Sequence, residues 1–339
     1  MSEVLVEVTR GNIIESRHRG SVAVVNGKGE LIAYAGDPTF MTYIRSAAKP
    51  FQAMNVLFSG AFEKFDLTQK ELAIMCSSHY GEDIHRETIR SILKKIGATH
   101  DDLLCGTPLS ISAAYRDKQL WDHLPIDETN SDCSGKHSGF LAVCKAKGYP
   151  LDTYTSPQHP MQKELLHIIS EMCGIAGPDI PIGIDGCGVP VYAMPLRNMA
   201  MGYARLSAAD QLDEPYRHAA KTICAAMTAY PEMISGTGGF CTEFLKHTQG
   251  RFCGKLGAEA VYCIGVMDRD LGIAIKIEDG SYRALYPAVM SVLDQLHLLD
   301  KKEQTALQPF CAPANKNDHG IAVGSISPCF SLHGRTCAS

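Results

Sequence analysis

Apolar and polar residues alternate near both ends of the chain, which is the pattern of β-strands that bury one face. Near the amino end, a short glycine-containing segment at 26–29 separates two such runs and predicts an antiparallel hairpin. Near the carboxyl end, the pair Asp279-Gly280 closes the last alternating run. The predicted strands are residues 5–8, 21–25, 31–34, 261–266 and 271–277.

In the middle of the chain, apolar residues recur at helical spacing. The first helix is predicted to begin near Ser46 and to end at Gly60. Thr68 and Glu71 have the spacing of a capping box, which predicts the start of another helix. Further helices are predicted over 84–96, with Gly97 as the stop, from Phe140 to Gly148, over 212–230 and over 286–298.

Strands at both ends with helices between them predict a sheet in which the terminal strands lie together and a helical region is inserted. This is the α/β class in its α+β form. We expect one domain over 1–339, with the sheet formed by about 4–37 and 254–332 and the helical region by about 46–250.

The composition is that of an ordinary globular protein, with 339 residues, 45% hydrophobic and 20% charged. The net charge of −5 and the absence of a basic cluster argue against a nucleic-acid partner. No secretory signal and no long apolar stretch are visible, so we expect a cytoplasmic protein without a membrane partner. The 13 cysteines are expected to be reduced, with Cys144, Cys173, Cys224 and Cys263 in the core.

Ser46 and Lys49 are three residues apart where the first helix is predicted to begin, so they can share a face. An amine with a depressed pKa could then take the proton of the hydroxyl and make a serine nucleophile. The simpler reading of the same residues is a helix-capping serine and a surface lysine.

Three polar clusters are further candidates for chemistry. Residues 77–79 (Ser-Ser-His) follow a predicted helix and resemble a site loop, but from these residues alone a cap for the helix that starts near Asp83 is favoured over catalysis. Residues 130–139 hold Cys133, Lys136 and His137 at a predicted helix start, and residues 183–190 hold Asp185, Gly186 and Cys187 among glycines. Either could be a simple turn. Cys133 and Cys187 together could bind zinc, although neither has a close second cysteine. The glycine spacings match neither a Walker A loop nor a dinucleotide fingerprint.

Taken in order, five motifs resemble the L-asparaginases of the rhizobial type, also called the asparaginase II family, within the serine β-lactamase-like superfamily. The motifs are Arg-Ser-Ala-Ala-Lys-Pro at 45–50, Cys-Ser-Ser-His at 76–79, Cys-Ser-Gly-Lys-His at 133–137, Asp-Gly-Cys at 185–187 and Gly-Lys-Leu-Gly-Ala at 254–258. The resemblance extends from about residue 4 to residue 332.

The resemblance implies a serine β-lactamase-like fold and hydrolysis of L-asparagine to L-aspartate and ammonia. It implies two Ser-Lys pairs, Ser46 with Lys49 and Ser78 with Lys255. Its zinc ligands match Cys133, Lys136 and Cys187, and the lysine would need a depressed pKa to bind a metal. Residues of its substrate pocket match Arg45, His137, Asp185 and Gly186. A homodimer is also implied.

We expect Ser46 to attack the side-chain amide, with Ser78 and Lys255 relaying protons. Lys49 and Lys255 near one site would lower each other's pKa. We expect zinc to have a structural or substrate-affinity role, because a serine already supplies the nucleophile. The alternatives are another serine amidase or penicillin-recognising hydrolase of the same fold, and a non-catalytic zinc-binding module.

Overall fold

The computed structural model describes residues 1–267 and 269–334 of the chain. Contacts within the chain divide it into two compact units. Unit 1 contains Met1–Ala47, Met194–Ala208 and the residues from His247 onward, and unit 2 contains Ala48–Ala193 and Ala209–Lys246. The chain therefore leaves unit 1 after its first strands and returns to it twice.

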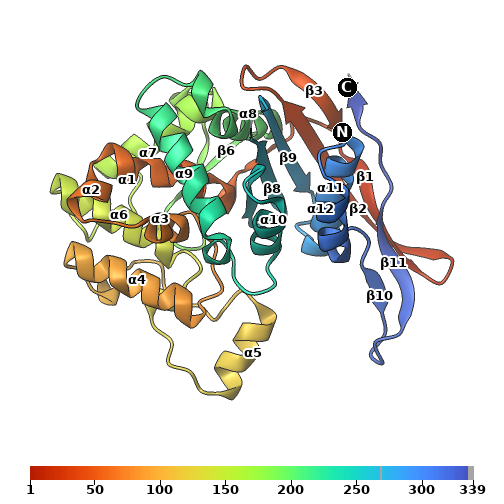
Figure 1. The fold of residues 1–339 in the computed structure, drawn as a ribbon, viewed down its shortest axis with the longest axis horizontal. Helices are drawn as coiled ribbons and strands as arrows, with labels where there is room; N and C mark the ends of the chain where they lie inside the picture. The colour runs from red at the N-terminus through yellow and green to blue at the C-terminus, as the bar shows by residue number, and fades with distance from the viewer. Residues whose placement is uncertain (268, 335–339) are drawn as a thin grey trace. The chain divides into compact units, whose positions relative to one another are not determined.

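Unit 1 is built on a large antiparallel sheet in which amino-terminal and carboxyl-terminal strands lie side by side (Figure 1). Its strand order is β10-β11-β1-β2-β9-β8-β7, and β3 pairs with both β2 and β12. The strands are β1 Glu3–Arg10, β2 Ile13–Val25, β3 Leu31–Ala35, β7 Phe252–Gly257, β8 Val261–Val266, β9 Leu271–Ile277, β10 Ala314–Lys316, β11 Ala322–Pro328 and β12 His333–Gly334.

Helices cover both faces of this sheet at its centre. Every residue of β8 and β9 is buried, as a strand covered on two sides requires. Helix α8 (Leu196–Ser207) packs on β2, β8 and β9, and helix α11 (Tyr282–Gln295) packs on β1, β9 and β11 (Figure 1). Gly272 allows the close approach of α8, because a Cβ there would lie 1.9 Å from the carbonyl oxygen of Ala200. Helix α12 (Lys301–Leu307) follows α11.

Unit 2 is a group of helices around α1, whose residues from Lys49 to Val56 are all buried. Helix α1 packs against α6, α7 and α9, and α3 packs against α4, α6 and α9. The helices are α1 Lys49–Phe58, α2 Ala61–Lys64, α3 Gln69–Met75, α4 Asp83–Ile96, α5 Ala113–Trp121, α6 Ser134–Lys147, α7 Pro160–Cys173, α9 Tyr216–Ala229 and α10 Phe240–Thr248, the last of which ends within unit 1. Strand β5 (Ile182–Ile184) pairs antiparallel with β6 (Pro190–Pro195), which ends within unit 1, and strand β4 (Met41–Tyr43) belongs to unit 1.

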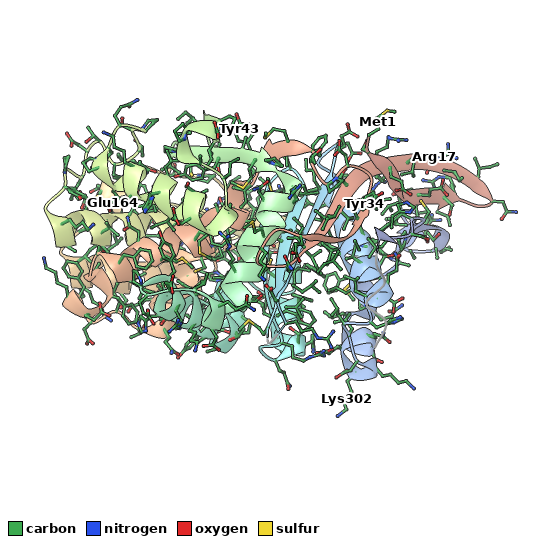
Figure 2. All side chains as sticks on the ribbon, turned by 90° about the horizontal axis from the view of Figure 1, so that it is seen from above. Met1, Arg17, Tyr34, Tyr43, Glu164 and Lys302 are labelled. Atoms are coloured by element: carbon green, nitrogen blue, oxygen red, sulfur yellow. The ribbon has the colours of Figure 1, made fainter. Side chains whose placement is uncertain are left out.

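A carboxylate joins three helical segments of unit 2. Glu164, on α7, is labelled in Figure 2. Its two oxygens accept hydrogen bonds from Asn55 at 3.1 Å, Lys147 at 2.7 Å and Tyr149 at 2.8 Å. These bonds outweigh the effect of burial, which by itself raises the pKa of Glu164, so that its pKa lies below the ordinary value. The contacts tie α7 to α1 and to the end of α6.

Two glycines bring α6 against its neighbours. A Cβ at Gly135 would lie 2.1 Å from the carbonyl oxygen of Ile74, and one at Gly139 would meet Met75 and Val56. A side chain at Gly135 would therefore force the backbones of α6 and α3 apart. Because both positions are glycine, the start of α6 lies beside the end of α3. This contact brings the polar clusters near residues 77 and 133 together.

Most of the predicted elements are present. The capping box of Thr68 and Glu71 is formed, and α4 ends with Gly97 in the left-handed conformation. The four cysteines predicted in the core are buried. Several boundaries were wrong: α6 begins at Ser134 and not near Phe140, α9 begins only at Tyr216 because Pro215 occupies the preceding position, and α11 covers Tyr282–Gln295, around Pro287.

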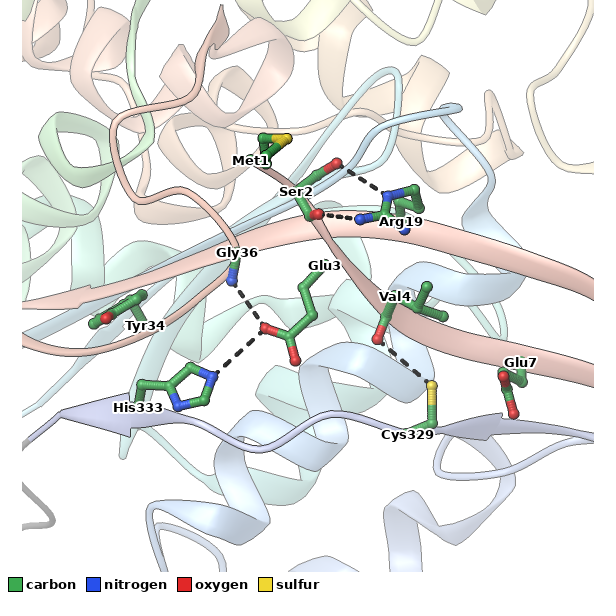
Figure 3. A pocket seen from close by; sticks show the side chains of 10 residues that line it. All are labelled: Met1, Ser2, Glu3, Val4, Glu7, Arg19, Tyr34, Gly36, Cys329 and His333. Carbon is green, nitrogen blue, oxygen red and sulfur yellow. Dashed lines mark hydrogen bonds and ion pairs between the residues drawn. The ribbon is translucent and has the colours of Figure 1, made fainter.

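Among the helices of residues 1–267 and 269–334, none is long and apolar enough to cross a membrane. Unit 1 has an open surface pocket of about 850 Å³ between its first strands and the end of the described chain (Figure 3). There Glu3 accepts a hydrogen bond from the Gly36 amide at 3.2 Å and lies 3.7 Å from His333 Nε2. None of the residues predicted for the active site lines this pocket.

Candidate active site

Lys49 and Ser78 form a buried hydrogen-bonded pair within unit 2. Lys49, at the first position of α1, is 1% exposed, and its Nζ donates to Ser78 Oγ at 3.0 Å. The same amine donates to the carbonyl oxygens of Ser77 at 2.6 Å and Asp132 at 3.3 Å. The Asp132 carboxylate lies 3.7 Å away. Three oxygen acceptors from two segments thus surround the amine of Lys49.

A buried histidine fixes the turn that carries Ser78. The Gly81 amide donates to His79 Nδ1 at 3.1 Å, so the ring proton is on Nε2, which donates to Ser134 Oγ at 3.0 Å. Ser134 in turn donates to the carbonyl oxygen of Ser131 at 2.7 Å. Burial, followed by the charges of His85 and Lys49, holds the pKa of His79 well below its ordinary value. His79 therefore joins the Ser78 turn to the start of α6 as a neutral side chain.

Two thiols and an amine meet at the start of α6. Cys133 precedes the helix, and Lys136 Nζ donates to Cys187 Sγ at 3.0 Å. A hydrogen bond from Cys133 lowers the pKa of Cys187 against the opposing effect of burial, and Lys136 lowers it further. The same hydrogen bond and burial raise the pKa of Cys133. Burial lowers the pKa of Lys136, but the charges of the two sulfurs outweigh burial and raise it overall.

This cluster fits a thiophilic metal ion. Cysteine sulfur and nitrogen ligands are the donors that zinc prefers. The Cys187 thiolate is paired with the buried Lys136 ammonium, and a metal cation could take the place of the ammonium proton in that pair. The raised pKa of Lys136 means that its amine must lose a proton before it can bind a metal. Cys133, Lys136 and Cys187, the three predicted ligands, are thus near one another in unit 2.

His137 and Asp185, two of the predicted substrate-binding residues, lie around the same cluster. His137 is fully buried on α6, and its Nδ1 is 2.7 Å from the hydroxyl of Tyr154. Burial lowers the pKa of His137. Asp185 is half-buried in the β5–β6 turn, and its carboxylate accepts a hydrogen bond from the Gly186 amide at 2.8 Å. The charge of Asp185 acts on Lys136.

The remaining predicted residues, Arg45, Ser46 and Lys255, belong to unit 1. Arg45 has a φ of 51°, which is strained for a residue with a side chain, directly before the half-buried Ser46. Lys255, on β7, is fully buried and donates to the carbonyl oxygen of Leu256 at 2.8 Å. A Cβ at Gly257 would lie 2.7 Å from the carbonyl oxygen of Ile44. The turn that carries Ser46 therefore packs closely against the end of β7.

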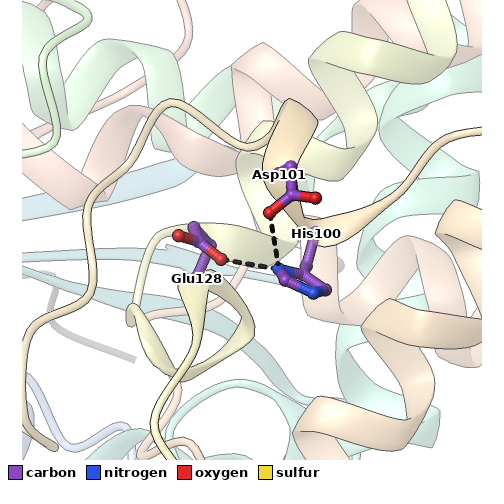
Figure 4. A group of neighbouring side chains, drawn as sticks. All are labelled: His100, Asp101 and Glu128. Atoms are coloured by element: carbon purple, nitrogen blue, oxygen red, sulfur yellow. Dashed lines mark hydrogen bonds and ion pairs between the residues drawn. The ribbon is translucent and has the colours of Figure 1, made fainter.

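A second group with metal-binding residue types lies on the surface of unit 2. The ligand atoms of His100, Asp101 and Glu128 all lie within 4.8 Å of one another (Figure 4). Within residues 1–267 and 269–334, this is the group of three His, Cys, Asp or Glu side chains that lie close enough to share a metal ion. His100 Nδ1 is 2.8 Å from Glu128 and 3.4 Å from Asp101. The hydrogen bond to Glu128 raises the pKa of His100, so the group is an exposed ion pair between two turns.

Sequence reasoning missed three residues of this region. Asp132 contacts Lys49 through both its carbonyl and its carboxylate. Tyr154 contacts His137, and Cys105 interacts with Cys187 and Lys136. Asp132 could have been found, because it lies in the densest polar cluster directly before Cys133. Tyr154 and Cys105 reach the site only through tertiary packing, and no local pattern marks them.

Comparison with known proteins agrees with the resemblance of the motifs. The model of the family described as L-asparaginase II matches residues 6–328. The chain belongs to the L-asparaginase II family. It is therefore a member of a family of amidohydrolases. None of the curated proteins searched matches the chain.

Solved structures similar to this asparaginase II family member include crystal structures of a protein named Mglu. The native form is 14% identical, with a TM-score of 0.37, over 84% of this chain and 66% of that chain. The glutamate form is 13% identical, with a TM-score of 0.37, over 83% of this chain and 61% of that chain. The chain thus spans about two thirds of the length of these proteins.

Proposed function

We propose that this protein hydrolyses L-asparagine to L-aspartate and ammonia through a serine nucleophile on a serine β-lactamase-like fold. The observation that carries the proposal is the family match over residues 6–328. It is supported within unit 2 by the contact between Lys49 and Ser78, since a buried amine hydrogen-bonded to a hydroxyl is an arrangement that can relay protons.

The reaction proceeds as acyl transfer in two steps. Ser46 Oγ attacks the side-chain amide carbon, and its proton passes to a basic group. The tetrahedral intermediate collapses when ammonia leaves with a transferred proton, and water then releases aspartate from the acylated serine. Ser46 is favoured as the nucleophile because it follows the strained residue Arg45, and backbone strain of this kind clusters at active sites. Backbone amides near a nucleophile stabilise the oxyanion, a contribution of about 3 to 4 kcal/mol per donor.

Lys49 is placed to exchange protons with Ser78. Its Nζ contacts the carbonyl oxygens of Ser77 and Asp132 and Ser78 Oγ. To act as a base, the amine must be unprotonated when it takes up a proton. Ser78 accepts a hydrogen bond from Lys49 and can relay a proton, which is the role we propose for Ser78 and Lys255.

The substrate is held through its two charged α-groups. We propose that Asp185, with Gly186 beside it, binds the α-ammonium and that Arg45 binds the α-carboxylate in bidentate fashion. His137 is fully buried and hydrogen-bonded to Tyr154, so its contribution to substrate binding is indirect, through the shape of the cluster at the start of α6.

We propose that Cys133, Lys136 and Cys187 hold one zinc ion. When bound, zinc would fix the start of α6 and the β5–β6 turn with Asp185 through their side chains, which supports substrate affinity. Serine supplies the nucleophile, so these residues have no assigned step in bond cleavage. We also propose a homodimer in the cytoplasm, as the family resemblance implies; light scattering of the purified protein tests the dimer.

The serine assignment is tested by replacing each hydroxyl. Ser46→Ala is expected to abolish ammonia release from asparagine, and Ser78→Ala to slow it while leaving a measurable rate. Intact-mass spectrometry of the quenched reaction should show an aspartyl adduct on the wild type and none on Ser46→Ala. An adduct that persists in Ser46→Ala and disappears in Ser78→Ala would reverse the two roles.

The substrate assignment is tested with asparagine, glutamine and a chromogenic cephalosporin in parallel. Ammonia release from asparagine is expected, and the parallel assay measures the relative rate on glutamine. Hydrolysis of the cephalosporin, or stable acylation by penicillin without asparagine turnover, would instead identify a penicillin-recognising hydrolase. Zinc binding without any of these reactions would identify a non-catalytic metal-binding protein.

A further inference from the structure

A glycine-containing segment of unit 2, residues 234–239, lies beside the turn that carries Ser78. The backbone amide of Ser78 donates to the carbonyl oxygen of Ile234 at 3.0 Å, and the amide of Tyr80 donates to that of Ser235 at 2.7 Å. These two bonds fix the backbone on both sides of His79. The position from which Ser78 contacts Lys49 therefore depends on where the segment 234–239 lies.

Two glycines bring this segment onto Tyr80. Gly236 has a φ of 139°, which residues with a side chain rarely adopt, and a Cβ there would lie 2.7 Å from a ring carbon of Tyr80. A Cβ at Gly239 would lie 2.5 Å from the Tyr80 hydroxyl. Close packing beside the Ser78 turn thus accounts for glycine at both positions.

The side chain that holds the segment in place from inside is Thr242, at the start of α10 and 6% exposed. Its hydroxyl donates to the carbonyl oxygen of Pro231 at 3.0 Å and accepts the Gly236 amide at 3.1 Å. It also lies 2.9 Å from Ser235 Oγ, which accepts the Thr242 amide at 3.1 Å. One hydroxyl therefore joins residues 231, 235 and 236 to α10.

A second anchor holds the outer side of the segment. The carboxylate of Glu82 accepts the Thr237 amide at 3.1 Å and the Thr237 hydroxyl at 3.2 Å, both at exposed positions. Water can replace exposed bonds of this kind. The Gly236 amide, in contrast, is buried, and losing the Thr242 hydroxyl would leave it without that acceptor, which is costly. Thr242 is therefore the stronger constraint on the segment.

We propose that Thr242 is a positioning residue for the reaction: its hydroxyl fixes the segment 234–239, and two carbonyl oxygens of that segment hold the turn from which Ser78 contacts Lys49. The inference rests on the proposed hydrolysis of asparagine and on the relay role of Ser78. A misplacement of about 1 Å in a site costs roughly 10²-fold in rate, so losing the hydroxyl should lower kcat by about that factor. KM should change less, because the groups proposed to bind the substrate lie on other segments.

The experiment compares ammonia release by the full-length wild type, Thr242→Val, Thr242→Ser and Thr228→Val. Thr242→Val keeps the shape of the side chain and loses the hydroxyl, whereas Thr242→Ser keeps the hydroxyl and should restore kcat. Thr228→Val is the matched control, because its hydroxyl bonds only within α9, to the carbonyl oxygens of Cys224 at 2.8 Å and Ala225 at 3.2 Å. It should retain the kcat and KM of the wild type.

Amide hydrogen exchange gives a second measurement. In Thr242→Val, the amides of Ser78 and Tyr80 should exchange faster than in the wild type, because the segment that accepts them is released. If Thr242→Val does not fold, the wild type decides. The amides of Ser78, Tyr80 and Gly236 should then exchange together as one unit, and exchange of Gly236 ahead of the other two would overturn the inference.

Wild-type kcat in folded Thr242→Val would also overturn the inference, and so would an equal loss in Thr242→Ser and Thr242→Val, which would assign the effect to packing. In each of these cases the wild type still hydrolyses asparagine, so the proposed function stands. A wild type that releases no ammonia from asparagine overturns the proposed function and this inference together.

Discussion

At the scale of single residues, Lys49 is the group whose surroundings constrain the chemistry most closely. It is 1% exposed, and its three donors are matched by three oxygens of two segments, at Ser77–Ser78 and at Asp132. An arginine could not replace it as a base, because a guanidinium does not lose its proton at neutral pH. The position thus demands an amine in particular, and a positive charge alone is insufficient.

Replacing Lys49 by methionine should lower kcat/KM for asparagine by about 10²- to 10⁴-fold, the usual contribution of a group that transfers protons. Lys49→Arg should not restore the rate. Lys94→Met, an exposed change on α4, is the matched control and should retain wild-type kinetics. Steady-state ammonia release measures all three. Wild-type kcat/KM in folded Lys49→Met would exclude Lys49 from proton transfer.

Gly257 provides a second prediction at this scale. A methyl group there would lie 2.7 Å from the carbonyl oxygen of Ile44, so Gly257→Ala should displace the turn that carries Ser46. A misplacement of about 1 Å costs roughly 10²-fold in rate, and a loss of that size in kcat/KM is expected. At Gly177 a Cβ meets only Leu166, at 3.9 Å, so Gly177→Ala is the matched control. Equal activity in the two variants would contradict the proposed role of the turn.

At the scale of elements, the central feature of unit 2 is the junction between the end of α3 and the start of α6. Gly135 allows the two backbones to touch, Lys49 bonds to both segments, and His79 bridges them through Ser134. The start of α6 is polar and yet buried, from Ser134 to Ser138. Hydrogen bonds between segments compensate for this burial, which is why the apolar pattern alone placed the helix too late.

The buried histidine at this junction should make stability depend on pH. The pKa of His79 in the folded protein is well below the ordinary value of 6.5. Between those two pKa values the unfolded chain binds a proton that the folded protein does not, so the free energy of unfolding falls as pH falls below about 6.5. One such group contributes at most about 1.4 kcal/mol per pH unit.

Urea unfolding between about pH 7 and about pH 5 measures this slope. His79→Gln should show a weaker pH dependence than the wild type, whatever its absolute stability. His319→Gln, at an exposed position, should leave the slope unchanged. His85 and His137, whose pKa values are also lowered, account for the pH dependence that remains in His79→Gln. An identical slope in His79→Gln and the wild type would show that His79 is not buried as a neutral group.

Elements with local signals were predictable from the sequence, and contacts between distant segments were not. The capping box at Thr68 and the glycine stop of α4 depend on a few neighbouring residues. The pairing of β2 with β9, in contrast, joins residues about 250 positions apart, and only the position of strands at both chain ends suggested it. Tyr154 has an ordinary sequence context, and its importance appears only when its hydroxyl is seen against His137.

At the scale of the whole molecule, the predicted site residues divide between the two units. Arg45, Ser46 and Lys255 belong to unit 1, and Lys49, Ser78 and the three proposed zinc ligands belong to unit 2. The sequence predicted this whole set of site residues only through the family resemblance. Spacing along the chain does not show whether residues more than 200 positions apart lie in one site. Within each unit, the structure gives the burial and the contacts of each of these residues, and substitutions can test them.

Zinc removal tests the role proposed for the cluster in unit 2. Dialysis against a chelator should raise KM for asparagine and change kcat less, because Cys133, Lys136 and Cys187 support the segments around the substrate and take no part in bond cleavage. Adding zinc back should restore KM. Circular dichroism should show an unchanged secondary structure in the metal-free protein. Complete loss of kcat with the fold intact would assign the metal a catalytic role instead.

The central claim is that the protein is an L-asparagine amidohydrolase that acts through a serine. It is tested most directly by measuring ammonia release from L-asparagine by the purified wild type beside Ser46→Ala. The account predicts sustained release by the wild type, in equal amount with aspartate, and none above background by the variant. No release by a folded, zinc-loaded wild type, or equal release by both proteins, would contradict it.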